Sequence, residues 1–389
     1  MIDNINNLKS SSLYYMSLGS MELFHSNFWF WLMRSNKKFI RAFFKENEIS
    51  NELLETIDIN KIKKEYRHTD ISIECNGEIF IIENKIKTLA NENQLMSYEF
   101  DFKNTFKKGK YLMVQNSEEV CFKLENWEPL LYKEVLDEIE SISNDLKETI
   151  NHNDYIVINE YIKMTRDVIF VIDESISDLK LNSTLLIDFK KGLMNYLTDL
   201  RLDDIIRKIN GSILFNILKK EFINDYKESE YYYQCGYNHK SITISIRRKV
   251  IINKDKYILI GPQLESNSFR RMIHITNKEF GINKTDYDLG KIYNILENFY
   301  FNDEKFKYPS PKKENKKKYN EYKGIYGDIK EGLEKVDYIA IYRYLKIDEE
   351  IINNDVSFEN IIRLFKEELE YIKTINLNDL VMKIECKES

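Results

Sequence analysis

Two acids and a lysine stand close together in the stretch Thr69–Tyr98, at the ends of a predicted β-hairpin. Asp70 begins the first apolar run, and Glu83 and Lys85 end the second. The runs are joined by Asn76-Gly77, the strongest short-range hairpin signal, because both residues tolerate a positive φ. Side chains alternate along a strand, so Glu83 and Lys85 project to the same face. Such a set can hold a divalent metal and a water, which phosphodiester hydrolysis requires.

This arrangement resembles the PD-(D/E)XK nuclease superfamily, in which an acid precedes a Glu-x-Lys pair that closes a hairpin. Here the acid is Asp70 and the pair is Glu83-x-Lys85. The helix that follows carries Gln94-x-x-x-Tyr98, which is similar to the motif that trails this core in the RecB-like branch.

A second resemblance lies upstream. The sequence ELFHSN from Glu22 to Asn27, followed by Trp29 and Trp31, looks like the opening helix of a bacterial PD-(D/E)XK family of uncharacterised nucleases. The resemblance covers roughly the first half of the chain. It departs from the usual motif at Thr69, where the superfamily has a proline before the first acid.

The resemblance implies a role for each residue of the hairpin. Asp70 and Glu83 would bind Mg²⁺, with Mn²⁺ as a substitute, because Mg²⁺ prefers hard oxygen ligands and keeps several waters. In the superfamily the backbone carbonyl between the acid and the lysine also binds metal, and here that carbonyl belongs to Asn84. Lys85 would orient the attacking water, and it would act as a base only with a much depressed pKa.

Other residues have more than one reading. Gln94 and Tyr98, one helical turn apart, would support Lys85 or the scissile phosphate if the resemblance holds. Glu22 is either a metal-adjacent acid or an acid favoured in the first turn of a helix. His25 is expected to pack or to form a hydrogen bond, not to act as a base. The whole hairpin could also be an exposed turn whose charges are solvated.

The elements around the hairpin predict an α/β chain. Met1–Gly19 is expected to be a frayed lead-in to a helix that begins near Met21, with its core side formed by Leu23, Phe24, Phe28, Trp31 and Leu32. The next predicted elements are a helical region Lys37–Thr56, a polar strand Lys61–Arg67, the hairpin, a helix Ala90–Asn104, a strand Lys110–Gln115, a helical stretch from Trp127 and a helix Asn153–Val168. A strand–helix–strand unit gives a partly parallel sheet. We therefore expect a restriction-endonuclease-like core, a mixed central sheet flanked by helices.

The second half of the chain predicts a separate α+β domain, rich in helix. Leu179–Ile209 has apolar residues at helical spacing, and from Tyr231 the period changes to that of strands. An apolar stripe marks a helix in the tail: Ile361, Ile362, Phe365, Leu369 and Ile372. We expect a nuclease domain over residues 1–178, a helical connector over 179–210 and an accessory domain of unknown role over 211–389.

Composition sets further bounds. A chain of 389 residues suggests about two domains, since single cores rarely exceed ~250 residues. The net charge of −6 argues against a protein that simply coats nucleic acid. The four cysteines form no C-x-x-C pair, which argues against a zinc ribbon and fits a reducing cytoplasm. No run approaches the ~20 apolar residues of a membrane span, so no membrane partner is expected.

Together these features predict a cytoplasmic, Mg²⁺-dependent nuclease that acts on DNA, with a role in anti-phage defence or restriction. Two alternatives stay open: a nuclease for RNA such as a tRNA-cutting toxin, and a catalytically silent nucleic-acid-binding protein with the same fold. Endonuclease action is expected, and exonuclease action stays open as well. A homodimer and a regulatory protein partner are further options.

Overall fold

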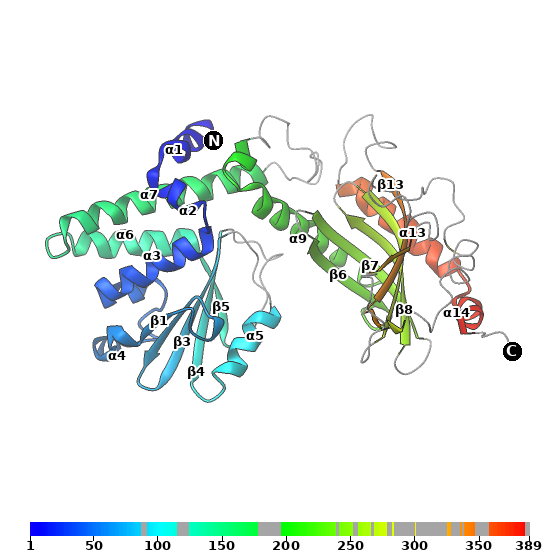
Figure 1. Cartoon of the computed structure of the whole chain (residues 1–389), viewed down its shortest axis with the longest axis horizontal. Coiled ribbons are helices and arrows are strands. Elements are labelled where there is room, and N and C mark those ends of the chain that lie inside the picture. The colour runs from blue at the N-terminus through cyan, green and yellow to red at the C-terminus, as the bar shows by residue number, and fades with distance from the viewer. Residues whose placement is uncertain are drawn as a thin grey trace. The chain divides into compact units, whose positions relative to one another are not determined.

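A computed structural model of the chain describes residues 1–86, 92–114, 124–177, 196–238, 241–251, 256–265, 268–277, 282–283, 300, 325–327, 335–336, 338–346 and 358–385. The chain divides into two compact units (Figure 1). The first consists of Met1–Asp178 and Lys190–Asn210, and the second of Leu179–Phe189 and Gly211–Ser389. Within the described residues, no helix is both long enough and apolar enough to cross a membrane.

The first unit is built on a five-stranded mixed sheet with the order β1-β2-β3-β4-β5. The strands are β1 (Ile62–Lys64), β2 (Ile71–Cys75), β3 (Glu78–Lys85), β4 (Phe106–Met113) and β5 (Trp127–Leu131). The first three pair antiparallel, whereas β4 and β5 run parallel to β3. The predicted α/β core with a partly parallel sheet is confirmed.

Helices cover this sheet on both sides (Figure 1). They are α1 (Ile2–Ser10), α2 (Ser12–Ser17), α3 (Met21–Ser35), α4 (Asn51–Thr56), α5 (Glu92–Asp101), α6 (Tyr132–Asp145) and α7 (His152–Ser177), with short 3-10 turns at Lys37–Ala42, Ile59–Lys61 and Tyr66–His68. Leu95 and Tyr98 of α5, and Phe102 directly after it, pack on one face of the sheet, in a cluster with Ile79, Ile81 and Trp127. Asn84, on the opposite face of β3, contacts α3 and α6.

The predicted hairpin is present. Asn76 and Gly77 have φ values of 51° and 82° and form the two-residue turn between β2 and β3. Positive φ at both positions is the backbone of a type I′ turn, which matches the right-handed twist of the strands. The register pairs Ile71 with Ile82 and Cys75 with Glu78.

Several local predictions are wrong. Residues 1–19 are not frayed, since they form α1 and α2 and bury Ile5, Leu8 and Tyr14. The predicted polar strand Lys61–Arg67 is limited to β1, after which the chain turns. Trp127 begins strand β5 and not a helix. That strand tolerates Pro129 because it lies at the edge of the sheet.

The core face of α3 is also different from the prediction. The buried residues are Met21, His25, Ser26, Trp29, Leu32 and Met33, whereas Leu23 is 39% exposed. The face that carries Ser26 therefore lies inward, toward Asn84 of β3. A helix that lines a buried polar site cannot be oriented from its apolar residues alone.

The second unit contains a six-stranded antiparallel sheet with the order β11-β13-β9-β8-β7-β6. Its strands are β6 (Tyr231–Asn238), β7 (Ser241–Ile251), β8 (Lys256–Glu265), β9 (Ser268–Asn277), β11 (Ile325–Gly327) and β13 (Tyr338–Lys346), and β10 (Ile282–Asn283) pairs separately with β12 (Lys335–Val336). Helices α9 (Asp203–Phe222) and α13 (Phe358–Thr374) pack on one face, where Ile242, Ile244 and Ile246 are buried as predicted. Helix α14 (Leu377–Glu385) ends the described chain.

The predicted helix Leu179–Ile209 is not continuous where the chain is described. Residues 178–195 lie outside the described part, and the backbone turns at 200–202, with Arg201 at φ 52°, before α9 begins at Asp203.

Candidate active site

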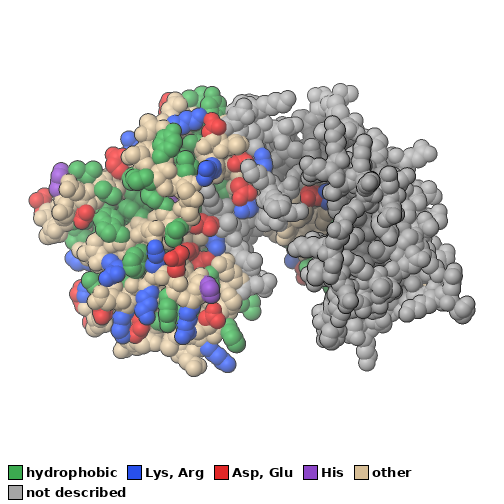
Figure 2. All heavy atoms as spheres, viewed as in Figure 1, with side chains coloured by type: hydrophobic (Ala, Val, Ile, Leu, Met, Phe, Trp, Pro, Cys, Tyr) green, Lys and Arg blue, Asp and Glu red, His purple; other side chains and the backbone are tan. Residues whose placement is uncertain are grey.

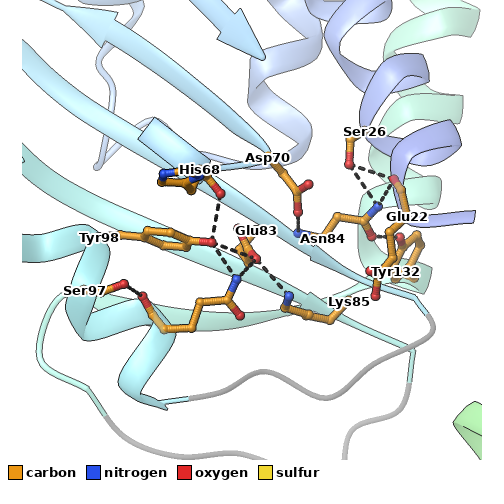
Figure 3. Close-up of polar contacts among 11 residues, drawn as sticks. Glu22, Ser26, His68, Asp70, Glu83, Asn84, Lys85, Ser97, Tyr98 and Tyr132 are labelled. Atoms are coloured by element: carbon orange, nitrogen blue, oxygen red, sulfur yellow. Dashed lines mark hydrogen bonds and ion pairs between the residues drawn. The ribbon is translucent and has the colours of Figure 1, made fainter. Parts of the chain in front are cut away.

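The hairpin register brings the two predicted acids together. Extending the pairing of Ile71 with Ile82 by one residue puts Asp70 directly opposite Glu83. Asp70 precedes β2, and its Oδ2 accepts a hydrogen bond of 2.7 Å from the backbone N–H of Asn84 (Figure 3). One oxygen of this carboxylate is therefore fixed against the neighbouring strand.

Glu83 is anchored through a single oxygen. Its Oε1 lies 2.9 Å from Lys85 Nζ and accepts a hydrogen bond of 3.0 Å from Gln94 Nε2. Tyr98 Oη lies 3.3 Å from the same oxygen. The other oxygen, Oε2, is buried and has no hydrogen-bond partner among the residues that the structure describes. Burying a carboxylate oxygen without a partner is costly, so this atom marks a position where a ligand would be favourable.

Gln94 and Tyr98 form a short chain behind Glu83. Gln94 Nε2 donates to Tyr98 Oη at 2.6 Å, and Tyr98 Oη lies 3.0 Å from the backbone oxygen of His68 (Figure 3). Helix α5 supplies both side chains from the same face of the sheet as Lys85. The structure therefore brings Gln94 and Tyr98 to Glu83, although the sequence expected them beside Lys85 or the phosphate.

Asn84 points to the opposite face of β3 and is fixed on that side. Its Nδ2 donates to the backbone oxygen of Glu22 at 2.7 Å and to Ser26 Oγ at 3.1 Å. Its Oδ1 accepts a hydrogen bond from the hydroxyl of Tyr132, the first residue of α6 (Figure 3). The side chain is fully buried, and these three bonds tie β3 to α3 and α6 at the residue between the acid and the lysine.

The segment before Asp70 has an unusual backbone. Glu65, Arg67 and His68 have φ values of 52°, 51° and 66°, which side chains other than glycine seldom adopt. Tyr98 contacts the carbonyl of His68, and Arg67 donates to the backbone oxygen of Asp101. Left-handed residues cost about 1 to 3 kcal/mol each and persist only where surrounding contacts hold them. For Arg67 and His68 those contacts come from α5, so the same helix contacts both Glu83 and the segment that leads to Asp70.

Burial and mutual repulsion shift the titration of this cluster. Burial, followed by the charge of Glu83, raises the pKa of Asp70 from 3.8 to about 7. Burial also raises the pKa of Glu83. For Lys85, burial alone would lower the pKa, but the charge and hydrogen bond of Glu83 outweigh it and the pKa is raised above 10.5. Lys85 is therefore an ammonium group at neutral pH and not a base.

Glu22 and His25 occupy the side of α3 that faces the site. The negative charge of Glu22 acts on both Asp70 and Lys85, but the described residues contain no group of three or more acids, histidines or cysteines arranged to hold a metal. His25 is buried, its Nδ1 lies 2.6 Å from Tyr161 Oη, and burial lowers its pKa to about 3. His25 is thus a neutral core residue.

Residues 12–191 match the family model of the PD-(D/E)XK nuclease superfamily. This range covers most of the first unit, which is therefore similar to this superfamily. The matched range contains the whole cluster around Asp70 and Glu83, and the superfamily is one of nucleases. No curated protein and no solved structure matches the chain. The match is to the superfamily as a whole, so the RecB-like branch and its Gln94-x-x-x-Tyr98 motif stay a prediction.

Sequence reasoning missed three contributors to this PD-(D/E)XK site. Ser26 and Tyr132 hold the side chain of Asn84, and the backbone of His68 holds Tyr98. Tyr132 lies 48 residues beyond Asn84. The stretch that contains it was expected to be helical for other reasons, and no local pattern pointed to this contact.

Proposed function

We propose that this protein is a Mg²⁺-dependent nuclease that hydrolyses phosphodiester bonds in DNA at the Asp70–Glu83–Lys85 cluster. The observation that carries the proposal is the pairing of Asp70 opposite Glu83, with Lys85 hydrogen-bonded to Glu83, inside a unit that matches the model of a nuclease superfamily. Residues 1–178 would form the nuclease domain, and residues 211–389 would select a substrate or partner.

The donor set fits a hard divalent cation. The negative charges of Asp70 and Glu83 repel each other, which a bound cation would relieve. Glu83 Oε2 is buried with no hydrogen-bond partner in the described part of the chain. Mg²⁺ is usually held by one or two carboxylates and keeps several waters. We assign Asp70, Glu83 and the backbone carbonyl of Asn84 as ligands, with Mn²⁺ as a substitute. When bound, the metal lowers the pKa of a water and neutralises charge on the phosphate.

The other residues have supporting roles in this proposal. Lys85, as an ammonium group, donates hydrogen bonds and so orients the attacking water and stabilises charge on the phosphate oxygens. Gln94 and Tyr98 hold Glu83 in one orientation. Glu22 adds negative charge that strengthens the attraction for a cation, without being required as a ligand.

The surface beside the cluster suits nucleic acid. Lys63 and Arg67 are exposed, and both lie over the ring of Tyr66, within a few residues of Asp70. Figure 2 shows Lys and Arg side chains interspersed with Asp and Glu on the visible face of the first unit. The exposed cations beside Asp70 can bind phosphates even though the whole chain carries a charge of −6.

The test is cleavage by the purified full-length protein. Linear, circular and single-stranded DNA and total RNA are incubated with Mg²⁺, Mn²⁺ or a chelator, and cutting of circles identifies endonuclease action. Asp70→Ala and Lys85→Ala should abolish cleavage. Lys107→Ala is the control, because Lys107 is an exposed lysine of β4 whose ion pair with Glu78 lies apart from the cluster.

The comparison of variants decides the outcome. Equal cleavage by the wild type, Asp70→Ala and Lys85→Ala would mean that a contaminant cuts and would refute the proposal. Cleavage of RNA alone would replace DNA by RNA as substrate while leaving the assignment of the site intact.

A further inference from the structure

A buried arginine stands out in the second unit. Arg247 lies on β7, and its side chain is on the face of the sheet opposite to α9 and α13, since Ile244 and Ile246 occupy the other face. Only 1% of Arg247 is exposed. Burial lowers its pKa to about 10, which still leaves the guanidinium fully charged at neutral pH.

No carboxylate balances this charge within the described residues. Two other arginines of the same sheet show the usual arrangement: Arg270 pairs with Glu265, and Arg271 pairs with Glu368 at 2.7 Å. Arg247 instead contacts two neutral side chains. Its Nη1 lies 3.0 Å from His274 Nδ1, and its Nη2 donates to Gln234 Oε1. An isolated buried charge is strongly unfavourable unless a counter-charge is supplied.

The groups around Arg247 are arranged as donors. A guanidinium can only donate, so His274 Nδ1 is an acceptor and the hydrogen of the neutral ring is on Nε2. Burial lowers the pKa of His274 to about 4, which keeps the ring neutral. Gln234 likewise turns its oxygen to Arg247 and retains its amide hydrogens. Arg247 Nε has no hydrogen-bond partner among the described residues. Both contacts of the guanidinium are thus made to neutral acceptors, and Arg247 keeps a buried donor that an anion could use.

The backbone makes room for this side chain. Gly261 lies on β8 between Arg247 and the strand that carries His274. A Cβ at Gly261 would overlap the carbonyl oxygen of Ile246 and would lie 3.2 Å from Arg247 Cγ. On the other side, the guanidinium lies 5.3 Å from the ring of Tyr232, which is 47% exposed. The ring of Tyr232 therefore lies between the guanidinium and the surface.

We propose that Arg247, together with His274 and Gln234, binds the phosphoryl oxyanion of a small ligand in the second unit. Planar guanidinium groups match the oxygens of a phosphoryl group through two parallel hydrogen bonds. The depth of Arg247 favours a compact anion over the backbone of a long polymer. The argument for this site does not use the proposed nuclease activity.

The test is calorimetric titration of the full-length protein at constant ionic strength in a buffer without phosphate. The two probes are inorganic phosphate and adenosine 5′-monophosphate. Wild type should bind in a saturable manner, and Arg247→Gln should weaken binding at least tenfold. Lys249→Gln removes an exposed cation two residues along the same strand and face, so it should change the affinity less than twofold.

A second variant keeps the test decisive if Arg247→Gln does not fold. Gln234→Glu places a carboxylate at the atom that already contacts Arg247, so it should raise thermal stability without phosphate and abolish phosphate binding. Absence of saturable binding of either probe to wild type up to about 10 mM would overturn the proposal. So would normal phosphate binding by Gln234→Glu, or equal losses in Arg247→Gln and Lys249→Gln. Tighter binding of the nucleotide than of phosphate would support it and identify a nucleotide as the source of the phosphoryl group.

Discussion

Replacing Asp70 by asparagine should stabilise the metal-free protein above pH 7, even though the same change removes a proposed metal ligand. The pKa of Asp70 is raised from 3.8 to about 7 by burial and by the charge of Glu83. In the unfolded chain this carboxyl loses its proton near pH 4. Between pH 4 and 7 the folded state therefore binds more protons, so this contribution to stability falls as the pH rises across that interval and is lost above 7.

The size of the effect follows from the two pKa values. The full difference between 3.8 and about 7 corresponds to about 4 kcal/mol, of which about 3 kcal/mol is lost between pH 5 and pH 8. Asparagine does not titrate, so Asp70→Asn should escape this loss. Its side-chain oxygen can still accept the hydrogen bond from the backbone N–H of Asn84. The advantage of the variant over wild type should thus be about 3 kcal/mol larger at pH 8 than at pH 5.

Tryptophan fluorescence during urea unfolding measures this unit alone. All three tryptophans, Trp29, Trp31 and Trp127, lie in the first unit, so unfolding of the second unit does not contribute. Both proteins are unfolded at pH 5 and pH 8 in the presence of a chelator. Asp101→Asn, at an exposed position on α5, is the control and should show the same difference from wild type at both pH values.

The comparison across pH cancels any packing change that does not depend on protonation. If the advantage of Asp70→Asn were equal at pH 5 and pH 8, the raised pKa would be refuted. Saturating Mg²⁺ at pH 8 should then stabilise the wild type by about 2.7 kcal/mol at 100 times its Kd, with little effect on Asp70→Asn. Equal stabilisation of both proteins by Mg²⁺ would contradict the assignment of Asp70 as a ligand.

Three further substitutions test the surroundings of the cluster. Lys85→Gln should reduce single-turnover cleavage about 100-fold or more while leaving the fold intact, and activity within tenfold of wild type would remove Lys85 from the mechanism. Tyr132→Phe leaves Asn84 Oδ1 without its donor, so the unfolding free energy should fall by about 1 to 3 kcal/mol. More metal should also be needed for half-maximal cleavage. An unchanged metal requirement would mean that the tyrosine contributes to stability alone. Gly77→Ala should lower the free energy of unfolding by about 1 kcal/mol or more, because residue 77 has a positive φ. Urea unfolding measures this loss, with Gly19→Ala as the control at an exposed position that has no positive φ. Equal losses in the two variants would argue against the type I′ turn.

The hairpin could be predicted because its information is local. Asn76-Gly77 defines a two-residue turn, the turn defines the register, and the register puts Asp70 opposite Glu83. Alternation along β3 then separates Glu83 and Lys85 from Asn84. Each step depends on residues within about one strand of each other, which is the range over which sequence patterns determine structure.

The rest of the site depends on contacts that no local pattern contains. Tyr132 reaches Asn84 from 48 residues away, and α5 contacts the left-handed residues Arg67 and His68 before Asp70. The predicted orientation of α3 was wrong for a related reason. Its polar residue Ser26 faces inward because Asn84 needs a partner there, which reverses the rule that polar residues of a helix face solvent.

The two carboxylates are each held in place through one of their two oxygens. Asp70 is held through Oδ2 by a backbone N–H, and Glu83 is held through Oε1 by Lys85 and Gln94. In each case the second oxygen makes no hydrogen bond to the described part of the chain. Anchoring one oxygen prevents rotation of the group, and leaving the other without a donor keeps it available to a cation. The same arrangement makes the metal-free cluster unstable above pH 7, because two buried negative charges face each other. A site that binds a cation tightly should therefore be one that weakens the protein when the cation is removed.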